Sequence, residues 1–380
     1  MLLKPTKIKT LIIKAIIIVV LLAIFLVLIL LKNNKDFCEQ YSRTFQRGYL
    51  FLFGHITGWI PFSVMEVLVL GLGIFVIFDL VRAIICFFTL RPLKAISKIL
   101  TVGIIAASMV TLFTMSFSLG YNRYPLELDT YEGEIKKEDL KSIAQYFLDD
   151  FNDCSSKLEY KENGEVISPY SLGEIQKILV KEYDKLDYPY LMKYTTSLKP
   201  LMTSFLFREL NITGITFGIT GEANINTLST ASEIPFTCAH ELAHTKGVMQ
   251  EREADYLAAY ITLNSDDYFL RYSGYMFSFY RLLSIADYTG NSGDYSELSG
   301  QISPKIKANS AYINKYWKDH DMLAKFEDWL NNLYLKNNGV EEGTANYGDS
   351  SPVVDEEEKK ITSLSNYQKI YFKIYYDNLG

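Results

Sequence analysis

The sequence predicts a helical membrane part followed by a mainly helical α+β domain that contains a short sheet. Long apolar runs with almost no charge are confined to the first third of the 380 residues. Residues 1–125 hold 13 Lys and Arg against 4 Asp and Glu, a net charge of +9, whereas the remainder hold 25 against 40, a net charge of −15. Beyond residue 125, apolar residues recur mostly at helical spacing. We therefore divide the chain into a membrane domain (1–125), a second domain (126–336) and a polar linker with a C-terminal segment (337–380).

Three segments of the membrane domain, at about 11–31, 62–88 and 99–121, are candidate transmembrane helices. The first is interrupted only by Lys14 and the third carries no charge, and both reach the roughly 20 residues that a helix needs to cross a bilayer. No small-residue cleavage site follows the first segment, which indicates an uncleaved helix rather than a signal peptide. The lipid bilayer is therefore an expected partner.

The middle segment is less uniform, because Glu66, Asp79 and Arg82 interrupt it. A re-entrant or interfacial helix therefore remains an alternative for 62–88. Asp79 and Arg82 are three positions apart, so the two side chains could pair near an interface and reduce the cost of burying their charges.

The distribution of basic residues predicts the orientation in the membrane. Lysines flank the first segment, and Arg82, Arg91, Lys94 and Lys98 lie in or beside the loop after the second one. The positive-inside rule places both regions in the cytoplasm, so everything after about Tyr121 is expected outside it. The acidic balance of that outer part argues against nucleic acid as a partner.

The second domain reads as helices with one short sheet. Helical spacing is clear at 137–151 and 172–186, and a further helical run follows Ser232 and Pro235. Strand-like alternation appears at Ile215, Phe217 and Ile219, and residues 223–226 offer a second extended piece. Residues 337–360 form a polar linker, and 367–376 could be a strand or an amphipathic helix. The four cysteines show no C-x-x-C spacing and predict neither a disulfide framework nor a thiolate metal site.

The strongest functional signal is the H-E-x-x-H pattern that begins at His240. On a helix, His240 and His244 lie one turn apart on one face, so both imidazoles can bind a single Zn²⁺ ion. Glu241 then lies beside the open coordination position, where it could act as the catalytic general base toward a zinc-activated water. Gly247 follows where a left-handed residue is expected to end the helix.

A catalytic zinc ion usually has three protein ligands, and the third is expected on a second helix that opens at Glu251. Glu251 shares its face with small residues, and Asp255 one turn further on could hold a ligand imidazole through its other ring nitrogen. Glu253 shares its face with larger residues that suit core packing. Glu251 is therefore the favoured third ligand, and Glu253 is the alternative.

This pattern resembles the gluzincin metallopeptidases, in which a glutamate on a second helix completes the zinc site and an aspartate lies behind it. More closely, the chain resembles a bacterial membrane family described as domain of unknown function 3810. The stretches that carry this resemblance are IPFSV (60–64), YNR (121–123), GEANIN (221–226), PFT (235–237), NSDD (264–267), RYSGY (271–275) and YLK (334–336). The resemblance implies a zincin-like second domain in a protein of the bacterial cell membrane. In zincins a strand upstream of the metal helix binds the substrate backbone, and Ala223, Asn224 and Asn226 occupy that place here.

Two tyrosines are weaker candidates for the site. A zincin needs a donor for the oxyanion opposite the base, and Tyr272 or Tyr275 could supply it, although core packing is the more common role of a tyrosine.

Together these features predict a membrane-anchored zinc metallopeptidase whose partners are a peptide or protein substrate and the bilayer. The alternative is a non-catalytic zinc-binding membrane sensor or assembly factor, because the sequence carries no evident signature of substrate specificity.

Overall fold

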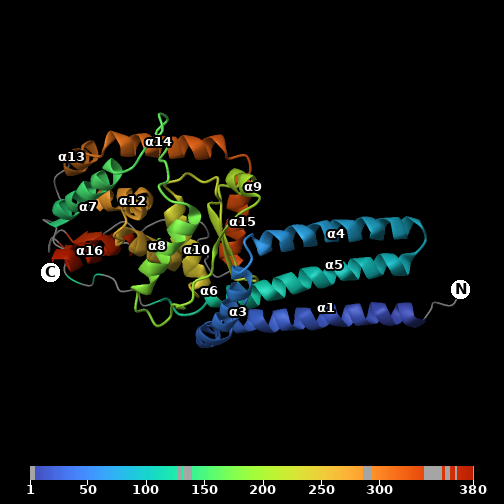
Figure 1. Ribbon diagram of the computed structural model, residues 1–380. Coiled ribbons are helices and arrows are strands. Elements are labelled where there is room, and N and C mark those ends of the chain that lie inside the picture. Colours follow the sequence, from blue (N-terminus) through green and yellow to red (C-terminus); the bar gives the residue numbers. More distant parts are fainter. Residues whose placement is uncertain are drawn as a thin grey trace. The chain divides into compact units, whose positions relative to one another are not determined.

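The computed structural model describes residues 5–126, 131, 133, 139–285, 293–337, 353–355, 360–363 and 366–379. The described chain is mostly helical, with an apolar helix at its N-terminus and a small three-stranded sheet. It divides into two compact units (Figure 1). Met1–Pro125 and the short segment Phe217–Glu222 form a membrane unit, and Leu126–Thr216 with Ala223–Gly380 form a second unit.

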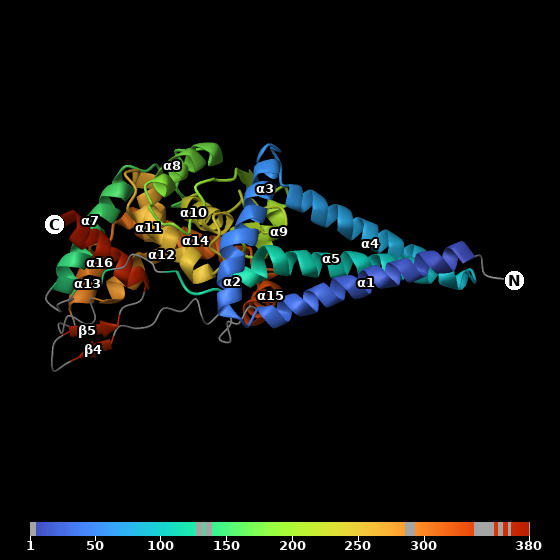
Figure 2. The ribbon, with the colours of Figure 1, turned by 90° about the horizontal axis from the view of Figure 1, so that it is seen from below.

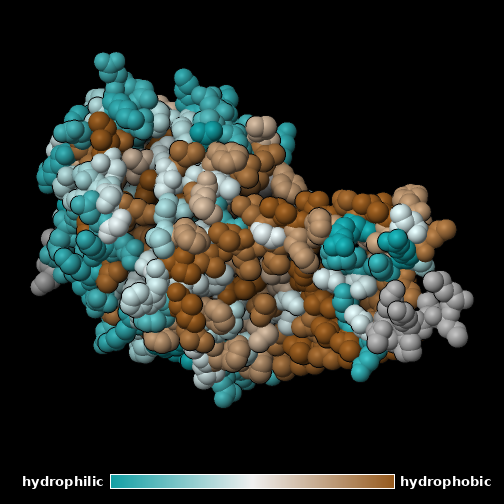
Figure 3. All heavy atoms as spheres, turned by 45° about the vertical axis from the view of Figure 1, so that its right-hand side comes forward, coloured by the Kyte–Doolittle hydropathy of each residue, from teal (hydrophilic) through white to brown (hydrophobic). Residues whose placement is uncertain are grey.

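Three long helices run side by side in the membrane unit: α1 (Pro5–Leu31), α4 (Val64–Phe88) and α5 (Pro92–Phe113). A wider helical turn, η2 (Thr114–Ser118), and α6 (Leu119–Tyr121) continue α5. Among the described residues, Ile8–Leu31, Val64–Phe88 and Pro92–Tyr121 are long and apolar enough to cross a membrane. Their exposed side chains are largely hydrophobic (Figure 3).

Helix α4 is unbroken along its 25 residues, although three charges interrupt its sequence. The expected pairing of Asp79 with Arg82 is wrong. Asp79 instead accepts a hydrogen bond of 2.8 Å from Nζ of Lys98 on α5, and Arg82 lies over the ring of Phe78. A partner on a neighbouring helix lets the Asp79 carboxylate face the bundle interior, where it is almost fully buried.

Helices α2 (Lys35–Tyr41) and α3 (Arg47–Gly58), joined by η1 (Ser42–Gln46), connect α1 to α4. They hold the segment Phe217–Glu222: the hydroxyl of Tyr49 donates to the Ile219 carbonyl at 2.8 Å, and that of Thr57 to the Thr220 carbonyl at 3.1 Å. The carboxylate of Glu222 accepts the backbone N–H groups of Val64 and Met65 at 3.0 and 2.8 Å. The segment is therefore bound where α4 begins.

The second unit contains helices that cover a small sheet. They are α7 (Asp139–Ser156), α8 (Leu172–Asp184), α9 (Ser204–Glu209), α10 (Ile234–Thr245), α11 (Glu251–Leu263), α12 (Tyr268–Leu283), α13 (Asp294–Gly300), α14 (Pro304–Asp319), α15 (Ala324–Asn337) and α16 (Asn366–Leu379). The helices expected at 137–151 and 172–186 correspond to α7 and α8, although residues 137 and 138 lie outside the described part.

The three-stranded sheet has the order β1-β3-β2. Strand β1 (Leu198–Pro200) is parallel to β3 (Glu222–Ile225), with Leu198 opposite Ala223, and β2 (Gly214–Phe217) lies on the other side of β3. The alternating pattern predicted a strand that includes Ile219, but β2 ends earlier because residues 218–221 form the turn to β3, in which Gly221 adopts a φ of +65°. A separate antiparallel pair, β4 (Val353–Asp355) and β5 (Lys360–Ser363), is visible in Figure 2.

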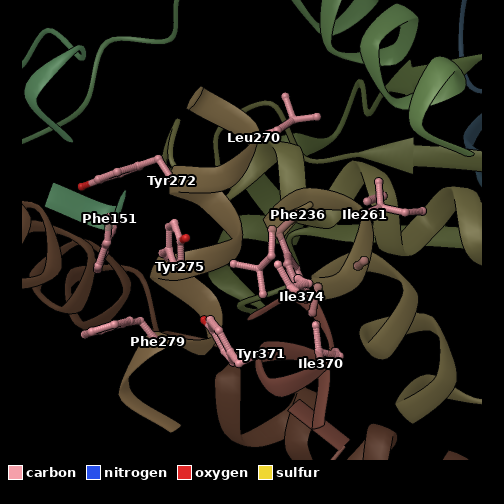
Figure 4. Packing of buried hydrophobic residues seen from close by; sticks show 14 of the residues in the cluster. Phe151, Phe236, Ile261, Leu270, Tyr272, Tyr275, Phe279, Ile370, Tyr371 and Ile374 are labelled. Atoms are coloured by element: carbon pink, nitrogen blue, oxygen red, sulfur yellow. The ribbon is translucent and has the colours of Figure 1, made fainter. Parts of the chain in front are cut away.

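An aromatic core joins α7, α12 and α16 (Figure 4). The end of the chain, for which strand and helix were both open, is the helix α16, and Ile370, Tyr371 and Phe372 on it are fully buried. The hydroxyls of Tyr371 and Ser278 are 2.6 Å apart, so α16 is bonded to α12. The C-terminal segment is therefore part of the second unit. Most of the linker expected at 337–360 lies outside the described residues.

Candidate metal centre

Two consecutive helices supply the residues of the candidate metal centre. Pro235 occupies the first turn of α10, where its missing N–H costs nothing, and α10 carries His240, Glu241 and His244. Gly247 has a φ of +100°, which confirms the expected left-handed end of the helix. The chain then turns and begins α11 at Glu251, in contact with α10.

Three donor atoms converge between these helices. Nε2 of His240 and Nε2 of His244 are 3.1 Å apart, and Oε2 of Glu251 is 3.2 Å from the first and 3.3 Å from the second. Within the described residues, His240, His244 and Glu251 are the group of His, Cys, Asp and Glu side chains close enough to hold one metal ion.

The outer nitrogen of each imidazole has a defined acceptor. Nδ1 of His240 is 2.7 Å from the Asp255 carboxylate, and Nδ1 of His244 is 2.7 Å from the carbonyl of Val248. A carbonyl and an ionised carboxylate only accept, so each Nδ1 carries the proton. The Nε2 atom of each neutral imidazole therefore presents a lone pair toward Glu251.

This arrangement fits a zinc ion. Three lone-pair donors at about 3 Å repel one another unless a cation lies among them. Ligands bound at about 2.0–2.1 Å in a tetrahedron are separated from each other by about 3.3–3.4 Å, close to the three separations observed. Two imidazoles and one carboxylate also match the donor set of known catalytic zinc sites.

The electrostatics of the cluster point the same way. Burial opposes the charged form of His240, but Asp255 and then Glu251 outweigh it and raise the pKa of His240 well above its usual value. Burial also opposes the carboxylate form of Glu251, yet the two imidazoles hold the pKa of Glu251 below its ordinary value. The cluster thus favours an ionised Glu251 beside a positive charge at the imidazoles, and either a proton or a metal ion can supply that charge.

The structure distinguishes the two glutamates of α11. Glu251 lies with the histidines, whereas Glu253 is buried elsewhere and accepts the backbone N–H of Leu126 at 2.7 Å. Positions two apart on a helix face different directions, which is why only one glutamate reaches α10.

Glu241 is almost completely buried, and burial raises the pKa of its carboxyl group above the usual range. The sequence did not identify its partner: Oγ1 of Thr216, on β2, donates to Oε2 of Glu241 at 2.7 Å. Gly214 on the same strand lies so close that a Cβ there would be 2.8 Å from Oε1 of Glu241. The polar member of an alternating strand, in the short sheet that precedes α10 in the sequence, is the signal that could have found Thr216.

The segment expected to bind substrate occupies the centre of the sheet. Ala223 and Asn224 lie in β3, between β1 and β2, and Asn226 directly follows it. All three are fully buried. The backbone N–H of Asn226 donates to Thr213 at 2.8 Å, and β3 has no free edge to which an extended peptide could add.

The structure does not bring the two candidate oxyanion donors to the cluster. The hydroxyl of Tyr272 donates to Asn309 and that of Tyr275 to Asp150, at 3.0 and 2.6 Å. Both rings are buried in the aromatic core around Phe151 (Figure 4).

The fold and the site define a mostly helical protein with three helices suited to a membrane and a His-His-Glu cluster in its second unit. A family model described as "Protein of unknown function (DUF3810)" matches residues 41–352, which is more than half of the chain. The chain belongs to this family. No curated protein and no solved structure matches the sequence.

Proposed function

We propose that this protein is a membrane-anchored zinc metallopeptidase with a zincin-like second unit. The observation that carries the proposal is the convergence of three lone-pair donors, His240, His244 and Glu251, beside a buried carboxylate, Glu241. A structural zinc site needs no base next to it, and its fourth position is usually filled by a protein ligand. The presence of Glu241 in this place therefore favours catalysis.

His240, His244 and Glu251 would hold the ion, and Asp255 and the Val248 carbonyl orient the two imidazoles. Zinc bound there supplies a Lewis acid that polarises a carbonyl group and lowers the pKa of water. Glu241 takes a proton from the attacking water as the water oxygen bonds to the peptide carbonyl carbon. It then returns this proton to the departing nitrogen as the C–N bond breaks, so that the carboxylate is restored.

The raised pKa of Glu241 suits this exchange, because a base that both takes and returns a proton works best when its pKa is near the working pH. Thr216 fixes the direction of one carboxylate oxygen of Glu241. Strand β2 is an edge strand whose residues contact Glu241, which favours β2 over β3 as the strand with which an extended substrate pairs.

The distribution of basic residues around the spans supports a location of this unit outside the cytoplasm. The resemblance to a bacterial membrane family supports the bacterial cell membrane as the place where the spans are inserted. The substrate class is therefore an extracytoplasmic peptide or protein.

Two measurements test the proposal. The purified full-length protein should contain about one zinc per chain, and His240→Ala should lose it. The matched control is His320→Gln, because His320 pairs with Glu209 and is not part of the cluster. A metal content that is the same in both variants would contradict the proposed site.

The second measurement compares extracytoplasmic peptides from cells that carry wild-type protein or the Glu241→Gln variant. The variant keeps all three metal ligands and loses the base, so its zinc content should stay the same while substrate peptides accumulate uncleaved. If Glu241→Gln fully replaces the wild type in a deletion strain, the zinc-binding sensor is the correct function.

A further inference from the structure

The surface of α15 carries an apolar face that the second unit leaves uncovered. Four positions of α15, namely Phe326, Trp329, Leu330 and Leu333, are each between 42 and 59 % exposed, and Met322 and Leu323 just before the helix are exposed as well. At 100° per residue, the four helical positions fall within an arc of about 100°. Leu335, on the opposite side of the helix, is 2 % exposed.

The composition of this face is that of a helix that lies in a membrane interface. It combines two aromatic rings, Phe326 stacked against Trp329 at 5.9 Å, with aliphatic side chains, and such rings are enriched at the level of the lipid headgroups. Lys325 and Lys336 are exposed and fall just outside one edge of the arc. Their stems can extend along the apolar face while their charges reach lipid phosphates.

Only a short piece of chain separates α9, to which the start of α15 is bonded, from the segment bound at α4. The backbone N–H of Leu323 donates to the Glu209 carbonyl at 2.9 Å, so the start of α15 is attached to the end of α9. Eight residues after Glu209 the chain reaches Phe217, the first residue of the segment bound at the start of the candidate span α4. Eight residues extend at most about 3.3–3.6 Å each, which limits this distance to about 30 Å.

We propose that the exposed face of α15 lies in the headgroup region of the bilayer and forms a peripheral membrane contact of the second unit. Helix α9, to which the start of α15 is bonded, also carries exposed apolar side chains, Phe205 and Leu206. The occupant is phospholipid, because the face carries aromatic rings with flanking lysines and the chain is tied to a span a few residues away. This contact is independent of the metal centre.

The protein contains three tryptophans, which allows a direct test. Full-length protein is placed in lipid nanodiscs in two versions. One keeps only Trp329 (Trp59→Phe, Trp317→Phe), and the control keeps only Trp317 (Trp59→Phe, Trp329→Phe). Trp317 is a matched reference, because it lies in the same unit and its indole donates to Glu233.

Phospholipids brominated near the top of the acyl chain should quench the fluorescence of Trp329 at least twofold more than that of Trp317. Aqueous iodide should quench Trp329 less in the nanodisc-bound protein than in the same protein unfolded in denaturant. Strong iodide quenching without bromolipid quenching would place the face in water and overturn the proposal. Protection from both quenchers would also overturn it, because another protein surface would then cover the face.

A second variant tests the role of the face itself. Phe326→Ser with Leu330→Ser, made in the version that keeps Trp329, should reduce bromolipid quenching while zinc content and circular dichroism stay the same. Both side chains are exposed, so their loss leaves the core intact. Unchanged quenching would mean that these side chains do not hold α15 at the bilayer.

Discussion

Thr216 donates a hydrogen bond of 2.7 Å from Oγ1 to the carboxylate of Glu241, and the same hydroxyl is 3.0 Å from the Glu241 backbone carbonyl. Strand β2 is thus fixed to α10 at the residue proposed as the base. The contact gives a specific role to a threonine that lies 25 positions away in the sequence.

Replacing Thr216 with valine keeps the shape of the side chain and removes its hydroxyl. A hydrogen bond to a charged group contributes about 1.5–3 kcal/mol, so we expect Thr216→Val to lower the free energy of unfolding by about that amount. Thr216→Ser keeps the hydroxyl and should cost less than about half of it. Denaturant unfolding of the purified protein measures both, and equal losses would show that the hydroxyl contributes nothing.

Glu251 and Glu253 are expected to differ in their effect on zinc. Glu251→Gln should strongly reduce the zinc content, because an uncharged amide is a poor ligand for the ion. Glu253→Gln should keep it, since its side chain accepts from Leu126 instead. Zinc analysis after dialysis against a weak chelator decides between them, and the reverse result would assign the third ligand to Glu253.

Asp255→Asn tests the support of His240. The amide can accept from Nδ1 but lacks the charge that makes the imidazole a better ligand, so zinc affinity should fall about 10–100-fold. Competition with a chromogenic chelator measures the change. Asp266→Asn, at an exposed carboxylate that pairs with Lys185, is the control and should bind zinc as the wild type does.

Burial raises the pKa of Glu233, even though Trp317 and Thr230 donate to it. A raised pKa in the folded state means that the folded protein binds the proton more tightly than the unfolded chain. The stability from this group is present below the ordinary carboxyl pKa and is lost as the pH rises through the folded pKa. Relative to Glu233→Gln, the wild type should therefore lose stability as the pH rises above the ordinary carboxyl pKa. Thermal unfolding of both proteins at a series of pH values measures the difference, and parallel curves would contradict the prediction.

The orientation can be measured with single cysteines in a Cys86→Ser background, since the other three native cysteines are buried. A cysteine at Lys157, an exposed position of the second unit, should react with a membrane-impermeant thiol reagent in intact spheroplasts. One at Lys94, an exposed position in the first turn of α5, should react only after the membrane is opened. The opposite pattern would invert the topology. Asn226 is unsuitable as a labelling site because it is fully buried.

The residues that the sequence located best are those whose geometry is local. His240 and His244 are one turn apart on α10, where helix periodicity determines which side chains share a face, and the left-handed turn at Gly247 follows within three residues. The first and third apolar runs were also recognised from length and absence of charge, whereas the charges in 62–88 left a re-entrant or interfacial helix open.

Contacts across long stretches of chain could not be predicted in this way. Asp79 pairs with Lys98 rather than Arg82 because the packing of α4 on α5 decides its partner. Tyr275 is directed to Asp150, which is 125 positions away, and Thr216 to Glu241. Whether 223–226 is a central or an edge strand depends on β1, which no local pattern reveals.

The contacts of the turn between β2 and β3 determine whether the second unit can be produced without the helices that precede it. A shortened protein that begins at Leu126 would keep Glu222 and lose the two N–H groups that its buried carboxylate accepts, and the carbonyls of Ile219 and Thr220 would lose Tyr49 and Thr57. Because β2 also carries Thr216, the damage would begin one residue from the contact with Glu241. Replacing the helices before residue 125 by an unrelated membrane anchor would remove the same hydrogen bonds. We therefore expect the two parts of the coding sequence to work only as a pair.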